Sequence, residues 1–141
     1  MEPEVDQMNL EALSIVIYAL LIFGAILVQA LYSSRTAGPA YGFSNREGDP
    51  PGMGAAGLRI DRTLANLKEG AIMYLPLALL AVSMDISNGW TSGAALLTIA
   101  SRLIYVPLFY LGIPVVRTLV WAPSFVAIPV LAAGILIGAA G

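Results

Sequence analysis

Long stretches of this chain are apolar and free of charge, and they alternate with polar segments. Residues 12–34 carry no charged side chain and would form a helix of about 34 Å, longer than the ~30 Å hydrocarbon core of a bilayer. Residues 118–141 are uncharged in the same way, and Gly134 and Gly138 give that run a face for close helix packing. The pattern predicts a first and a last helix that each cross a membrane.

The two middle stretches are too short to cross a membrane unaided. Residues 70–84 and 86–101 would form helices of only about 22 Å and 24 Å. Each helix must therefore draw polar neighbours into the bilayer, at roughly 2.5–3.5 kcal/mol for each charge near the centre of a span. We expect membrane spans at about residues 10–34, 58–84, 90–111 and 115–140.

Polar segments connect these spans. Residues 35–57 hold six Gly and three Pro and predict an irregular loop. The pair Asn88-Gly89 predicts a tight turn, and Gly112-Ile113-Pro114 separates the third span from the fourth. The whole chain, residues 1–141, is therefore expected to form one all-α domain, an integral membrane four-helix bundle.

The composition agrees with lipid as the solvent and excludes several functions. Hydrophobic residues make up 58% of the 141 residues and charged residues only 11%, against about 25% charged in soluble domains. Seven basic residues and a net charge of −2 leave no basic surface for nucleic acid. Because the chain has no Cys and no His, we expect no metal site, and any thiol chemistry needs a thiol that a substrate brings.

The basic residues indicate how the bundle is oriented. Apart from Arg102 in the third span, they lie in or beside the long loop or follow the turn at Gly112, whereas the N-terminal segment, the turn at Asn88-Gly89 and the C-terminus have none. Since Lys and Arg favour the cytoplasmic side, we expect both termini on the non-cytoplasmic side. The excess of Arg over Lys and the many Ala and Gly residues hint at a bacterial source, so the expected location is a bacterial inner membrane.

A polar face on the second predicted span meets polar groups on the third. On a helical wheel Arg59, Arg62, Asn66 and Glu69 share one face, and Asp61 and Lys68 lie on the opposite one. Counted from the turn between the two spans, Glu69 lies about 24 Å deep and Arg102 about 21 Å. We therefore expect a buried Arg102–Glu69 ion pair, which either belongs to a site or only fixes helix register.

The other polar residues have two readings each. With Glu69 paired, Arg62 and Asn66 remain as donors for an anionic ligand, while Arg59 either joins them or reaches lipid phosphate. Arg117, in the first turn of the last span, is either a site for a carboxylate or thiolate or a positive-inside anchor. Two aromatic residues, Tyr105 and Tyr110, either hydrogen-bond a ligand or belong to the aromatic belt of the membrane.

These residues and their spacing resemble a known family. The pattern Arg59-x-x-Arg62-x-x-x-Asn66-x-x-Glu69, then Arg102-x-x-Tyr105, then Tyr110-x-Gly112-x-Pro114-x-x-Arg117-Thr118-x-x-Trp121 is similar to that of MAPEG proteins, the membrane-associated proteins in eicosanoid and glutathione metabolism. The loop segments Gly38-Pro39-Ala40-Tyr41 and Ser44-Asn45-Arg46-Glu47 resemble those of the bacterial branch of the family. One departure is Gly70, which follows Glu69 where an aromatic residue is common in the family.

The resemblance implies a homotrimer in membrane lipid that binds glutathione between subunits. By similarity Arg62, Asn66 and Glu69 would hold the charged ends of the tripeptide, Arg102 would brace Glu69, Tyr105 would contact the peptide, and Arg117 would stabilise the thiolate. The implied function is that of a glutathione-dependent transferase or peroxidase acting on small lipophilic electrophiles. The alternative is a non-catalytic structural or lipid-binding bundle in which the Arg102–Glu69 pair only fixes assembly.

Overall fold

Four long helices form the molecule, and a computed structural model describes residues 8–45, 47 and 53–141, without the side chains of residues 114–117. The long helices are α1 (Leu10–Thr36), α3 (Gly54–Ser83), α4 (Gly89–Leu111) and α5 (Pro114–Ala140), and the short helix α2 (Pro39–Gly42) follows α1. The described residues contain no strand, so the expected all-α four-helix architecture is confirmed.

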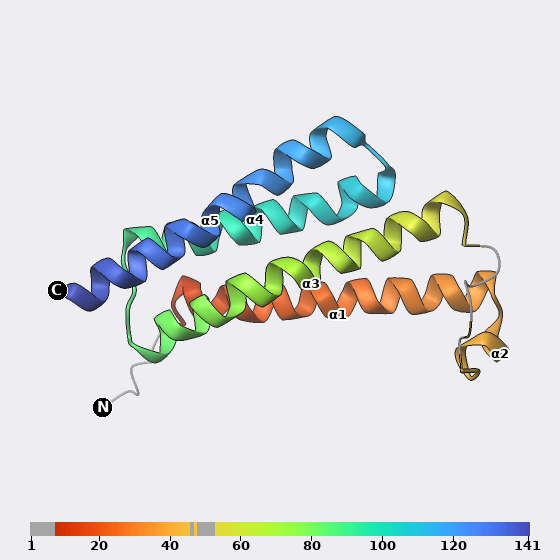
Figure 1. Cartoon of the computed structure of the whole chain (residues 1–141), viewed down its shortest axis with the longest axis horizontal. Coiled ribbons are helices and arrows are strands. Elements are labelled where there is room, and N and C mark those ends of the chain that lie inside the picture. Colours follow the sequence, from red (N-terminus) through yellow and green to blue (C-terminus); the bar gives the residue numbers. More distant parts are fainter. Residues whose placement is uncertain (1–7, 46, 48–52) are drawn as a thin grey trace, which may run out of the picture.

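The helices lie as two antiparallel pairs, α1 with α3 and α4 with α5 (Figure 1). The start of α1 and the end of α5 lie at one end of the bundle, here called the terminal end. The end of α1, the short helix α2 and the start of α3 lie at the opposite end, here called the loop end, where α4 also gives way to α5 (Figure 1).

The surface of the four long helices is that of a membrane protein. Each is long and apolar enough to cross a bilayer, and large apolar side chains such as Leu20, Ile72 and Leu119 are exposed along them. Since water does not favour such a continuous apolar surface, the chain is an integral multi-pass membrane protein. The side of the membrane that its termini face stays a prediction.

Small residues let α5 approach α4 closely at the terminal end. A Cβ added to Gly134 would lie 2.8 Å from Trp90 Cβ and 3.0 Å from the backbone nitrogen of Thr91, and one added to Gly138 would meet Ile86. The Asn88 side chain caps α4 and donates to the Gly134 carbonyl over 2.9 Å. The glycine face expected on the last span is therefore confirmed.

A buried carboxylate that the sequence analysis does not anticipate joins α1 to the start of α4. Glu11 is fully buried and accepts hydrogen bonds from the hydroxyls of Thr91 (2.5 Å), Ser92 (3.0 Å) and Ser87 (3.2 Å). These donors come from the first turn of α4 and the residues before it, where the positive end of a helix favours an anion.

Candidate functional site

A cavity of about 230 Å³ opens between α3, α4 and α5 on the loop-end side of the bundle. The side chains that line it come from all three helices: Asn66 from α3, Tyr105 and Phe109 from α4, and Thr118 and Trp121 from α5. The cavity therefore lies where the two helix pairs meet, next to the first turn of α5.

Aromatic rings form much of the cavity wall. The rings of Tyr105 and Phe109, four residues apart on α4, lie 5.4 Å apart and tilted, and Trp121 stacks on Phe125 at 5.1 Å. Asn66 is half-buried and supplies an amide group to this wall. The cavity is thus apolar for most of its surface, with a few polar groups that can orient a ligand, as small-molecule sites usually are.

Arg102 lies buried beside this cavity, with only 2% of its surface exposed. Its guanidinium carbon lies 5.9 Å from the centre of the Tyr18 ring and 5.7 Å from that of Tyr105. A Cβ on Gly70 would come within 2.5 Å of Arg102 Nη2 and of the Tyr18 hydroxyl. The absence of a side chain at Gly70 is therefore what lets the cation pack against α3.

The prediction of an Arg102–Glu69 ion pair is wrong for the single chain. Between described residues the structure has no ion pair with Arg102, whose Nε and Nη1 are buried without a hydrogen-bond acceptor, and Glu69 is exposed. Glu69 and Gly70 are neighbours on α3, about 100° apart around the helix axis. The residue that faces Arg102 is Gly70, so the aromatic faces of Tyr18 and Tyr105 stabilise the cation instead.

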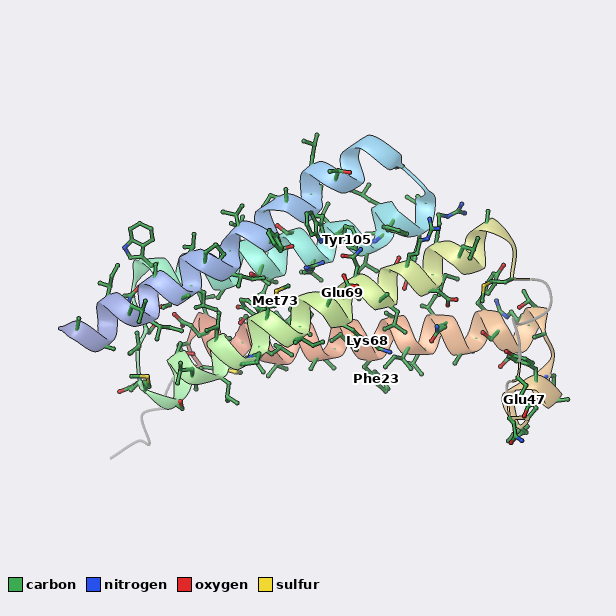
Figure 2. The ribbon with its side chains drawn as sticks, viewed as in Figure 1. Phe23, Glu47, Lys68, Glu69, Met73 and Tyr105 are labelled. Carbon is green, nitrogen blue, oxygen red and sulfur yellow. The ribbon has the colours of Figure 1, made fainter. Side chains whose placement is uncertain are left out.

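The polar face of α3 is turned partly outward. Arg62 and Glu69 are exposed, one turn before and one turn after the half-buried Asn66. In Figure 2 Glu69 lies on the edge of α3 toward α4, and Lys68 lies on the edge toward α1. Of the expected glutathione-binding residues, the structure brings Asn66 and Tyr105 to the cavity and leaves Arg62 and Glu69 beside it on the surface.

A hydrogen bond joins Arg59 on α3 to Tyr110 on α4. Arg59 Nε donates to the Tyr110 carbonyl over 3.2 Å, in the last turn of α4. A guanidinium at this position donates to a carbonyl that has no hydrogen-bond partner within the helix. Its positive charge also interacts favourably with the negative end of the helix dipole. The Tyr110 hydroxyl is buried without a hydrogen-bond partner among the described residues. Arg59 therefore has a helix-capping role, whatever else it binds.

Two further residues, Arg117 and Trp121, belong to the start of α5 near this cavity. The side chain of Arg117 is outside the described residues; its position is in the first turn of α5, directly before Thr118 of the cavity wall. Trp121, to which the sequence analysis assigns no role, also lines the cavity. Its position three residues after Thr118 places both on one helix face, a signal that was available in the sequence.

Comparison with known proteins identifies the family. The family model for the MAPEG family matches residues 12–137, nearly the whole chain. No curated protein and no solved structure matches it. A match of this length, on a chain with four membrane-length helices, shows that this integral membrane protein belongs to the MAPEG family.

Proposed function

We propose that this protein activates the thiol of glutathione and transfers the tripeptide to small lipophilic electrophiles. The MAPEG family includes glutathione transferases and peroxidases and proteins of eicosanoid metabolism. The observation that carries the proposal is the cavity between α3, α4 and α5, because Asn66 and Tyr105 line it next to the first turn of α5. A lipophilic substrate enters such an apolar cavity from the bilayer.

The proposed chemistry requires little of the chain's own side chains. The chain has no Cys and no His, so the nucleophile is the thiol that glutathione brings. A thiol of pKa ~8.5 becomes a better nucleophile when a nearby cation lowers that pKa. In this proposal the thiol proton passes to water, and Arg117 and the backbone N–H groups at the start of α5 stabilise the thiolate that remains. The thiolate forms a carbon–sulfur bond with the electrophile as the bond to the leaving group breaks and that group departs with the electron pair.

The proposed assembly is a homotrimer in which neighbouring chains complete the site. Arg62 and Glu69 are exposed on α3, yet charges facing hydrocarbon are costly. A second chain, or the charged ends of glutathione held between two chains, would cover them. Buried Arg102 Nε and Nη1, which have no acceptor among the described residues, are donors for a carboxylate that enters from this side.

One observation favours the second candidate function, a non-catalytic bundle. Arg59 caps α4 and Arg102 packs between two tyrosine rings, so both cations already hold helices together. In that case the polar groups fix helix register and the chain conjugates nothing.

A conjugation assay separates the two candidates. The purified full chain, with glutathione and a generic aryl halide, is expected to form the thioether faster than buffer does. Replacing Arg62 by Ala should weaken glutathione binding roughly tenfold, since hydrogen bonds to charged groups contribute about 1.5–3 kcal/mol. The matched control is Lys68→Ala, an exposed cation on the opposite edge of the same helix (Figure 2), which should leave the rate unchanged. A wild-type rate equal to that of buffer would favour the structural bundle.

A further inference from the structure

A second cavity, of about 360 Å³, lies at the loop end on the other side of α3. It is bounded by α1, α2 and α3, and no residue of the first cavity lines it. Along α1 its wall follows one helix face, from Ile26 through Gln29 to Ser33, and Tyr41 of α2 and Asp61 of α3 complete it. The proposed glutathione chemistry uses none of these residues.

Asp61 is the charged group of this cavity. Its Oδ1 accepts a hydrogen bond of 2.8 Å from Gln29 Nε2. Within the described ranges, no Lys or Arg side chain forms an ion pair with it. Asp61 lies about two helical turns before Lys68, and its hydrogen bond with Gln29 places it on the side of α3 that faces α1. The cavity therefore holds a half-buried carboxylate that lacks a cationic partner in the described structure.

The cavity lies at the depth of lipid headgroups. Asp61 is about 33 Å along α3 from Ser83, the last residue of that helix, so a bilayer core of ~30 Å ends close to it. The cavity wall on α1 becomes more polar toward the end of that helix, from the exposed apolar Ile26 to the polar Ser33 and Ser34. A phospholipid changes from apolar to polar along its length in the same way.

We propose that this cavity binds the headgroup of phosphatidylethanolamine, with its primary ammonium group on the Asp61 carboxylate. An ammonium has three N–H donors, and the carboxylate, the Gln29 carbonyl and the serine hydroxyls are acceptors. A choline headgroup has no N–H and is usually recognised by several aromatic rings, whereas Tyr41 is the one aromatic residue among the described residues of this wall. A serine headgroup adds a carboxylate that Asp61 would repel.

Lipid binding by the full-length protein tests this site. The protein is placed in bilayers of phosphatidylcholine with and without phosphatidylethanolamine, and its melting temperature and the lipid retained in native mass spectrometry are measured. We expect phosphatidylethanolamine to bind about tenfold more tightly than phosphatidylcholine. Replacing Asp61 by Asn keeps an acceptor for Gln29 but removes the charge, so the preference should disappear.

Two further variants separate a specific site from a general effect. Asp85→Asn makes the same chemical change at an exposed position after the other end of α3 and should keep the preference. Ser33→Leu fills the cavity with Asp61 intact and should remove it. Equal binding of the two lipids, or a preference that survives both Asp61→Asn and Ser33→Leu, would overturn the proposal. Displacement of the lipid by millimolar soluble ethanolamine would show a site for free amines and would overturn the lipid assignment.

Discussion

The surroundings of the buried Arg102 guanidinium depend on one small residue, Gly70. Its guanidinium packs against α3 at Gly70 and lies between the rings of Tyr18 and Tyr105. Tyr18 is held in turn by a hydrogen bond of 3.0 Å from its hydroxyl to the Leu67 carbonyl. Because a guanidinium is weakly hydrated and stacks on aromatic faces, this arrangement keeps a cation at membrane depth without an ion pair in the described structure.

A methyl group at position 70 should disturb this arrangement. In Gly70→Ala the new Cβ would meet Arg102 and the Tyr18 hydroxyl at 2.5 Å. These atoms are side-chain ends, but both side chains are buried and cannot move aside freely. Overpacking in such a place costs about 1–3 kcal/mol, against the ~1 kcal/mol that Ala gains over Gly in a helix. We expect a lower melting temperature in detergent. The matched control is Gly24→Ala in α1, where nothing lies within 4 Å of the added Cβ; an equal loss of stability in both variants would contradict this account.

Glu11 should stabilise the bundle far more than an exposed carboxylate does. Glu11→Ala leaves the hydroxyls of Ser87, Thr91 and Ser92 without this acceptor, and hydrogen bonds to charged groups contribute about 1.5–3 kcal/mol. Thermal unfolding is expected to show a clear loss, whereas Glu47→Ala, at an exposed position, should change stability little. Equal melting temperatures for the two variants would mean that the buried carboxylate is not stabilising.

At the scale of the helices, close contact between α4 and α5 depends on the glycines of α5. The contacts of Gly134 include the backbone nitrogen of Thr91, so the neighbour cannot relieve a clash by rotating a side chain. Membrane helices gain little from burying apolar surface against one another, and close packing of small residues is a main source of their association. This pair of helices is therefore sensitive to any increase in size at Gly134.

Replacing Gly134 by Ala should weaken the α4–α5 pair by about 1–3 kcal/mol, the usual range for overpacking. The hydrogen bond from Asn88 to the Gly134 carbonyl would lengthen as the helices separate. Unfolding in denaturing detergent measures the effect. Gly93→Ala in α4 serves as the control because its added Cβ meets nothing within 4 Å, and similar unfolding of both variants would refute the packing argument.

The sequence predicts the helices better than the side-chain contacts. Long runs without charge reveal where the four membrane-length helices lie. This works because a helix that crosses the hydrocarbon core must avoid charged residues over many consecutive positions. The four-residue helix α2 is too short for any periodic pattern to show. The Arg102–Glu69 pair is predicted incorrectly because equal depth does not fix direction: one step around α3 separates Glu69 from Gly70. Glu11 lies close to the end of its span and therefore resembles a solvated charge in the sequence.

In the proposed function, a single chain forms only part of the glutathione site. The cavity between the two helix pairs holds Asn66 and Tyr105, while Arg62 and Glu69 are exposed on the same helix face. A homotrimer would cover these charges, and light scattering of the protein in detergent would then give the mass of three chains. We propose that the assembled site binds glutathione as a thiolate.

Ultraviolet absorbance of bound glutathione would show whether the bound form is the thiolate. The wild-type protein, titrated with glutathione near neutral pH, is expected to show the absorbance of a thiolate, since a nearby cation lowers the pKa of a thiol from ~8.5 toward neutrality. The Arg117→Ala variant should lose this absorbance, and the Lys68→Ala variant should keep it. No thiolate signal from the wild type at saturating glutathione, or an unchanged signal in Arg117→Ala, would contradict the account.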